Sequence, residues 1–372
     1  MRELFRRLPS VWGNAGLVLM ARFAAMGAGL GTSVLTARVL GPSGRGIYYV
    51  AIMLAALASQ FGNLGLHAAN IWLASREPKL VGRLAGNSVW ISIVLGCAAG
   101  LAVSLFARLT GSVDAASEVQ LGAISLLSVA LLLQLLIGNL LAGMARTTWY
   151  CVLQIAGSAA GFAAATFTAV VGGGVAEILW VTASVILLAL LFMLVAINTV
   201  EPIPWRFDVP LVRKGLGYAL RAFIVNLLGF LVTRACLFIL GSLRDSSEVG
   251  HFSIASQLFD VFANVPASVS LMLFPQIVRT NSGWAQTQRM AMWLALAGVV
   301  MVALLWPLLP RLITGLFGAS FAPSVPVARA ILPAVVFYAA VSVLSQYPAA
   351  NGMPVSLIGV WLLLFSVACA TS

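Results

Sequence analysis

Continuous apolar runs of about 20 residues are the feature of this sequence that most limits its fold. A helix needs about 20 apolar residues to cross the hydrocarbon core of a bilayer. Inside lipid the backbone must satisfy its own hydrogen bonds, which leaves only helix bundles and closed barrels. A barrel would show segments of about ten residues that alternate apolar and polar, and these runs do not alternate. We therefore expect an all-α integral membrane protein, a polytopic helical bundle.

The composition agrees with a protein whose main solvent is lipid. Of 372 residues, 61% are hydrophobic and 8% are charged, whereas a soluble domain carries about 25% charged residues. The net charge of +11 lies mostly in short loops between the apolar runs, where membrane topology explains it. We therefore expect no nucleic acid partner. No phosphate-binding glycine loop, metal-ligand spacing or catalytic triad is visible, so we expect no cofactor, no metal and no enzyme.

The apolar runs predict eleven membrane spans, at residues 14–35, 47–66, 87–106, 121–141, 150–171, 175–197, 218–240, 250–273, 290–309, 327–344 and 355–370. Turn residues separate several of them, among them the Gly41-Pro42-Ser43-Gly44 run. With the N-terminus in the cytosol, cytosolic segments hold twelve Lys and Arg residues and the opposite side holds six. This bias predicts a cytosolic N-terminus.

The longest connections, residues 67–86 and 198–217, both face the cytosol on this topology. The second divides six spans from five. We therefore expect an N-terminal lobe at residues 1–197, a cytosolic linker at 198–217 and a C-terminal lobe at 218–372. The first outer loop is expected at residues 36–46.

A weak internal repeat supports two related lobes. A shift of 204 residues superposes span 1 on span 7 and span 2 on span 8. It also aligns Gly46 with Gly250, Tyr48 with Phe252, Val50 with Ile254, Ala51 with Ala255 and Gln60 with Asn264. This pattern predicts two pseudo-symmetric six-helix lobes related by an axis along the membrane normal. The second lobe would be short of its last span.

Several segments resemble a known family. The stretch RVLGPSGRGIY at 38–48 and FGNLGL at 61–66 look like the first-hairpin signature of polysaccharide and oligosaccharide flippases. These belong to the multidrug/oligosaccharidyl-lipid/polysaccharide exporter superfamily. LGSLRDSSEVGHF at 240–252 resembles the start of its second lobe, and residues 330–354 resemble its tenth span and the following loop. Members commonly have twelve or fourteen spans, so we expect a truncated or shortened member.

The resemblance implies a transporter that flips polyprenyl-pyrophosphate-linked oligosaccharide by alternating access, in a bacterial-type cytoplasmic (inner) membrane. Its expected partners are the lipid-linked oligosaccharide, membrane lipid and polysaccharide assembly proteins. Two alternatives stay open. One is an ion-coupled multidrug exporter of the same superfamily, with Asp260 as a proton or sodium site. The other is a membrane-embedded glycosyltransferase, ligase or polymerase, which the lack of a large outer loop argues against.

Charged residues inside spans are costly and so point to function. Arg22 is expected near mid-membrane, Arg234 and Asp260 could pair between neighbouring spans, and Arg221 near a span end could snorkel. Members of the family often carry an acid beside the arginine late in span 7. Thr233 and Ala235 flank Arg234 instead, which argues against ion coupling there.

The resemblance implies that the in-span arginines neutralise the pyrophosphate. Polar span residues would accept sugar hydroxyls, with helix–helix hydrogen bonds as their alternative role. The predicted substrate-binding residues are Arg22, Arg221, Arg234, Asp260, Gln60 and Asn226.

Overall fold

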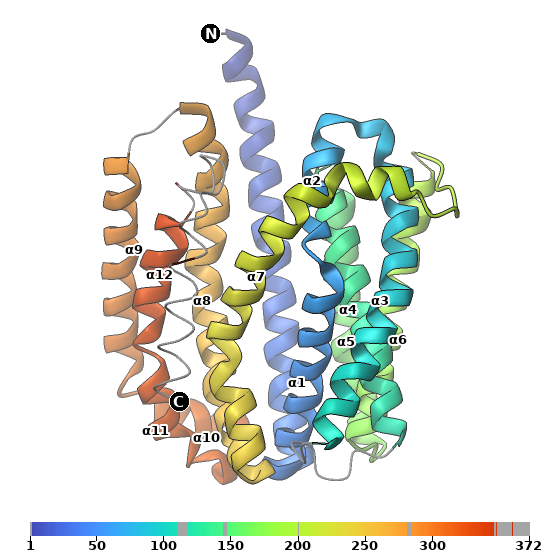
Figure 1. Cartoon of the computed structure of the whole chain (residues 1–372). Helices are drawn as coiled ribbons and strands as arrows, with labels where there is room; N and C mark the ends of the chain where they lie inside the picture. Colours follow the sequence, from blue (N-terminus) through green and yellow to red (C-terminus); the bar gives the residue numbers. More distant parts are fainter. Residues whose placement is uncertain are drawn as a thin grey trace. The chain divides into compact units, whose positions relative to one another are not determined.

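The structure is a computed structural model that describes residues 2–109, 118–143, 147–199, 201–280, 284–345, 347 and 359. Every regular element in these ranges is a helix, which confirms the all-α prediction (Figure 1). The chain divides into two compact units. Residues 1–32 and 47–243 form unit 1, and residues 33–46 and 244–371 form unit 2. The lobe boundaries expected at 198–217 stay a prediction.

Helix α1 (Arg2–Asn63) covers the first two predicted spans and the loop expected between them. Only Gly41 leaves helical geometry, with φ 67° and ψ −177°. The prediction of a loop at 36–46 is therefore wrong, because the helix reaches Leu40 and resumes at Pro42. Proline is well tolerated in the first turn of a helix, where its missing N–H would be unpaired anyway. One glycine in a left-handed conformation is enough to end the first helix.

Unit 1 continues through α2 (Leu66–Arg76), a short 3₁₀ turn η1 (Pro78–Leu80), α3 (Val81–Leu109), α4 (Glu118–Gly143), α5 (Thr147–Val170), α6 (Val175–Asn198) and α7 (Val209–Leu243). Helix α4 packs against α2, α3, α5 and α6, and buries Leu132, Leu136, Ile137 and Leu140.

Two glycines allow α3 and α4 to approach closely. A Cβ atom on Gly96 would lie 2.9 Å from Val129 Cα, and one on Gly100 would lie 2.9 Å from Ser125 Cα. Glycines four residues apart on one helix face are the usual way to bring two membrane helices into backbone contact, because lipid supplies no hydrophobic drive between them.

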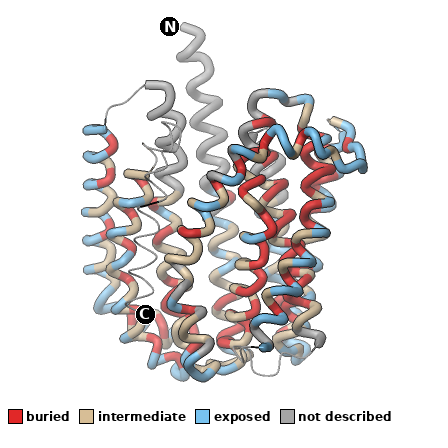
Figure 2. The backbone as a smooth tube through the Cα atoms, viewed as in Figure 1, coloured by how far each residue is buried: buried red, intermediate tan, exposed pale blue. Residues whose placement is uncertain are grey.

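Unit 2 contains α8 (Ser246–Thr280), α9 (Trp284–Leu305), α10 (Leu309–Phe317), η2 (Ala319–Phe321), α11 (Ser324–Ile331) and α12 (Ala334–Leu344). Helix α12 packs on α8 and α9. Only a narrow stripe of α9 is buried, at Thr287, Ala291 and Gly298, and most of the helix is exposed (Figure 2). An apolar helix exposed along most of its surface suits a lipid environment.

Six helices in the described residues are long and apolar enough to cross a membrane, or seven if the bent α7 is included. The first is Phe23–Asn63, which contains most of predicted spans 1 and 2. Residues 324–344 also pass as one span, matching the predicted span at 327–344. The predicted span at 355–370 lies outside the described residues, Gly359 apart. The chain is a multi-pass membrane protein, and the count of eleven spans stays a prediction.

Helix α7 contains a sharp bend. Val209–Gly217 and Ala222–Val232 meet at an angle of 68°. Helix α7 packs against α2, and its first part runs at a steep angle to the rest of the helix (Figure 1). We call Val209–Gly217 the arm of α7. The sequence prediction placed these residues in a linker, whereas the structure makes them helical.

Candidate functional site

The helix is interrupted between α1 and α2 at Leu64 and Gly65, and α2 packs against α7. Leu64 and Gly65 both have positive φ, at 46° and 75°. A Cβ atom on Gly65 would lie 1.8 Å from the Ala219 carbonyl oxygen, so only glycine fits there. Broken helices in transporters present polar groups at membrane depth where they line a cavity. The break therefore makes this part of unit 1 a candidate binding site.

Three polar side chains connect the broken ends. The amide oxygen of Asn63 accepts the His67 N–H at 3.1 Å, so its Nδ2 faces the ring and lies 2.7 Å from His67 Nδ1. On the other side of the ring, Nε2 lies 3.4 Å from Asn226 Nδ2 on α7. A ring that accepts at Nδ1 is neutral and carries its proton on Nε2. This N–H donates to Asn226 when the Asn226 amide is turned so that its oxygen faces the ring. These residues form the Asn63–His67–Asn226 chain.

Burial keeps the His67 ring neutral. The residue lies in α2, which is not among the helices long enough to span the membrane. Burial lowers its pKa from 6.5 to about 4, because a buried site disfavours the charged imidazolium. The chain is therefore an uncharged hydrogen-bonding surface at neutral pH, suited to hydroxyl or amide groups.

The structure brings some of the predicted site residues together. Asn226 is part of the Asn63–His67–Asn226 chain, and Gln60 is half-buried one turn before Asn63 on α1. Arg234 lies eight residues beyond Asn226, or about 12 Å along the helix. Its Nη1 donates to the hydroxyl of the buried Tyr49 at 3.3 Å. Gln60, Asn226 and Arg234 therefore follow the seam between α1, α2 and α7.

The other three predicted residues, Arg22, Arg221 and Asp260, stay predictions. Arg22 and Arg221 lie on α1 and α7, but their side chains lie outside the described part of the structure. Asp260 lies on α8 in unit 2, where its backbone carbonyl accepts a hydrogen bond from Asn264 Nδ2 at 2.7 Å. The predicted pairing of Arg234 with Asp260 stays a prediction.

Residues 201–208, which form neither helix nor strand and which we call the strap, lie along one face of α3. Cβ atoms on Gly82 and Gly86 would lie 2.2 Å from the Pro202 oxygen and 2.4 Å from the Pro204 oxygen. One turn further on, the Trp90 indole N–H donates to the Trp205 carbonyl at 2.9 Å. Spacing by four residues places Gly82, Gly86 and Trp90 on one helix face, so the strap follows a groove in α3.

Asp208 binds the end of the strap to α3 through hydrogen bonds and an ion pair. Its backbone N–H donates to Asn87 Oδ1 at 2.7 Å and its carbonyl accepts from Asn87 Nδ2 at 3.1 Å. Its carboxylate pairs with Arg83 and accepts the Leu211 N–H, which makes it the N-terminal cap of α7. Burial raises the pKa of the Asp208 carboxyl, but the Arg83 hydrogen bond, the Leu211 N–H and the Arg83 charge together bring it below its ordinary value.

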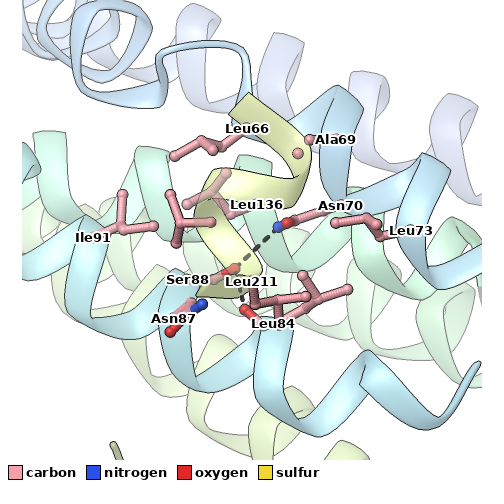
Figure 3. A pocket seen from close by; sticks show the side chains of 12 residues that line it. Leu66, Ala69, Asn70, Leu73, Leu84, Asn87, Ser88, Ile91, Leu136 and Leu211 are labelled. Carbon is pink, nitrogen blue, oxygen red and sulfur yellow. Dashed lines mark hydrogen bonds between the residues drawn. The ribbon is translucent and has the colours of Figure 1, made fainter. Parts of the chain in front are cut away.

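A small pocket lies beneath the arm of α7. Leu211, Val212 and Gly215 of the arm line it together with residues of α2, α3 and Leu136 of α4 (Figure 3). Asn70 Nδ2 donates to Ser88 Oγ at 3.0 Å inside it, as the dashed line in Figure 3 shows. The apolar side of the arm therefore packs inward.

Residues 33–46 form a second polar cluster, in unit 2. Arg45 is 2% exposed, and its guanidinium donates to Thr36 Oγ1 at 2.6 Å, Ser33 Oγ at 2.8 Å and Ser253 Oγ at 3.3 Å. Arg38 donates to the carbonyls of Leu316 and Gly315 at the end of α10. The sequence interpretation counted Arg38 and Arg45 only as outer-loop charges, and it missed this role.

The two glycines that the internal repeat aligns meet in this cluster. A Cβ atom on Gly46 would lie 1.8 Å from the Ser246 oxygen, and one on Gly250 would lie 2.0 Å from the Pro42 oxygen. Each glycine therefore packs on the carbonyl four residues before the other. This reciprocal contact is what a two-fold relation between the repeated segments predicts.

The described residues contain no group of three or more His, Cys, Asp or Glu side chains that could hold a metal ion. The seam in unit 1 instead offers neutral donors and acceptors together with the cationic Arg234. Such an arrangement binds hydroxyl-rich or anionic groups by hydrogen bonds, with arginine able to bind phosphate oxygens in pairs.

Comparisons with known proteins agree with the helical architecture. A family profile described as "Polysaccharide biosynthesis protein" matches residues 11–281. An inward-facing MATE family multidrug resistance transporter of the MOP superfamily is similar over 96% of both chains, with 15% identity and a TM-score of 0.61. The DinF-BH multidrug transporter in complex with R6G covers 93% of this chain and 85% of its own, with 14% identity and a TM-score of 0.60.

A MOP superfamily transporter from Pyrococcus furiosus is similar over 96% of this chain and 92% of its own, with 14% identity and a TM-score of 0.54. Its binding pocket is described as having reversed polarity. At these identities the similarity shows the fold. No curated protein matches the sequence.

Proposed function

Because the chain belongs to the family of polysaccharide biosynthesis proteins, we propose that it flips polyprenyl-pyrophosphate-linked oligosaccharide across a bacterial-type cytoplasmic membrane. The family match over residues 11–281 is the observation that carries this proposal. It agrees with the resemblance of the RVLGPSGRGIY segment to the flippase signature. The fold, shared with transporters of the MOP superfamily, supports movement of a substrate rather than chemistry upon it.

The proposed mechanism is alternating access, with the lipid tail remaining in the bilayer. Arg22, Arg221 and Arg234 neutralise the pyrophosphate, since arginine binds phosphate oxygens bidentately. Gln60 and Asn226 accept sugar hydroxyls, and the neutral Asn63–His67–Asn226 chain extends that polar surface. Asp260 contributes from α8, either to the substrate or to a cation that drives transport.

Deletion of the gene tests the function. We expect the surface polysaccharide to disappear and its lipid-linked precursor to accumulate on the cytosolic leaflet. Plasmid-borne wild type restores both. Normal surface polysaccharide in the deletion strain, with no other flippase gene present, would refute the proposal.

Arg22→Ala tests the phosphate site. We expect it to abolish precursor transport while membrane expression stays near normal, and Arg22→Lys to recover only part of the activity, because lysine keeps the charge but not the planar fork. A role in folding alone predicts lower expression or thermal stability with normal transport per molecule. Both quantities are measured on the same preparations, and normal specific transport by Arg22→Ala would rule out the assigned role.

A second candidate function is ion-coupled multidrug export, because the fold is equally that of multidrug transporters. Asp260 would then bind the coupling ion. The deletion strain would become more sensitive to cationic dyes and keep its lipid-linked precursor at wild-type levels. Measuring dye accumulation beside the precursor separates the two functions.

A further inference from the structure

The end of unit 1 that carries the strap and the arm of α7 exposes aromatic and basic side chains together. Trp205 is 60% exposed and Phe207 is 48% exposed. Arg206 lies between them, and Arg213 projects from the arm. Among the described residues neither Arg206 nor Arg213 has an ion pair or a hydrogen bond. Lys214 next to Arg213 pairs with Glu77 at 2.5 Å, and both side chains stay about half exposed.

The backbone holds these side chains in place. The strap lies in the groove of Gly82, Gly86 and Trp90, and Asp208 fixes its end to α3. The arm is anchored by its opposite face, where Leu211 and Gly215 are buried. The outward direction of Trp205, Phe207 and Arg213 therefore does not depend on contacts that those side chains make.

We propose that the strap and arm form a docking surface for the anionic phospholipid of the adjacent leaflet, which is the cytosolic leaflet on the predicted topology. Charge complementarity selects this occupant. Within the described part of the chain Arg206 and Arg213 are cations without an ion pair, whereas acidic lipid headgroups carry the opposite charge. Tryptophan and phenylalanine beside arginine suit the boundary between headgroups and acyl chains. The 68° bend between the arm and the rest of α7 lets the arm run along the bilayer while the rest of the helix enters it.

The two arginines determine how strongly the surface prefers anionic lipid over neutral lipid. Each basic residue near an anionic surface favours binding by about fivefold, and the attraction falls off within a Debye length. Removing both charges should therefore weaken docking by about 25-fold in low salt. Neutral lipid leaves only the aromatic contribution.

Depth-dependent quenching tests the proposal on the full chain in nanodiscs. Val209 is exposed beside the strap, so a Val209→Cys variant, with the four native cysteines changed to alanine, carries a polarity-sensitive dye. Discs contain phosphatidylcholine alone or with one-third phosphatidylglycerol, and a trace of lipid that is spin-labelled near its headgroup. We expect stronger quenching and a blue shift in the anionic discs, with the difference removed by high salt.

The charge variant Arg206→Gln/Arg213→Gln should abolish the difference between the two lipid compositions. Arg244→Gln is the control, because Arg244 is an exposed arginine that belongs to neither the strap nor the arm, and it should keep the difference. Unchanged thermal unfolding of the double variant establishes that it is folded. Equal quenching in both discs, or an unaltered response in the double variant, would overturn the proposal. Displacement of the dye signal by inorganic pyrophosphate at constant ionic strength would also overturn it, in favour of a phosphate site.

Discussion

Arg45 shows how one residue can fix a turn between two membrane helices. Its side chain is buried, and its hydrogen bonds reach Ser33, Thr36 and Ser253. A buried guanidinium is costly unless its donors are satisfied, and here three hydroxyls share that task. Arg45 therefore stabilises the segment around Gly41 from a buried position, although the topology count placed this residue among the charges outside the membrane.

Arg45→Ala is expected to destabilise unit 2 by about 2–4 kcal/mol, because it removes three hydrogen bonds to a charged donor and leaves a cavity. Thermal unfolding in detergent measures the loss. Arg38→Ala is the control and should cost less, since its side chain is exposed and, among the described residues, it bonds only to the carbonyls at the end of α10. Equal unfolding temperatures for wild type and Arg45→Ala would contradict this account.

His67 predicts a specific pH dependence of stability. Its folded pKa of about 4 lies below the ordinary value of 6.5, so between these values the unfolded chain binds a proton that the folded chain does not. The contribution of His67 to stability is therefore complete above pH 6.5 and is lost as the pH falls towards 4. His67→Gln, which keeps a neutral hydrogen-bonding side chain, should flatten this part of the profile. Unfolding temperatures measured from pH 7.5 to 4.5 check it, and identical slopes would exclude His67 as the cause.

At the scale of elements, hydropathy predicted several of the helices but did not predict the connections between them. Apolar length predicts where a span lies, and α3, α4, α5 and α6 match their predicted positions within a few residues at most ends. The strap was not predictable in the same way, because its contacts are backbone carbonyls set over Gly82 and Gly86. Glycine has no side chain, so a hydropathy profile does not show where another segment packs on it. The spacing of Gly82, Gly86 and Trp90 was the only available indication.

The sequence identified only some of the polar residues that the structure brings together in the candidate site. Gln60 and Asn226 stood out as polar residues inside apolar runs, whereas His67 fell just past a predicted span and was assigned to a membrane face. The break at Leu64 and Gly65 turns it back towards Asn63 and Asn226. A left-handed backbone at a leucine has no reliable sequence signature.

Gly86→Val is expected to displace the strap from α3, because a side chain there would meet the Pro204 carbonyl. Arg206 should then become more accessible to trypsin, and cleavage at that position should accelerate several-fold. Gly217→Ala is the control, since a Cβ atom there meets nothing within 4 Å. Limited proteolysis followed by mass spectrometry of the fragments gives the rate at Arg206. Unchanged cleavage in Gly86→Val would show that the glycine groove does not retain the strap.

For the whole molecule, the distribution of positive charge predicts the orientation. Twelve of the Lys and Arg residues lie on the predicted cytosolic side and six on the other, and loops rich in these residues stay in the cytosol. The strap, the arm and the candidate lipid-docking surface all take their assignment to the cytosolic leaflet from this bias.

A reporter inserted next to Arg206 tests the orientation directly. We expect fluorescence from a cytosolic reporter and no activity from a phosphatase that works only in the periplasm. An insertion next to Asp114, in a predicted outer loop, serves as the opposite control and should give the reverse result. Phosphatase activity at Arg206 would invert the topology.

The reciprocal contact of Gly46 and Gly250 also restricts how the two halves of the gene could diverge. A side chain gained at either position would meet a backbone carbonyl of the other segment, so both codons are restricted to glycine. The position just before the glycine shows no such agreement, because Arg45 is aligned with Val249. Glycine at this contact is therefore the one agreement of the weak repeat that backbone packing requires in both segments.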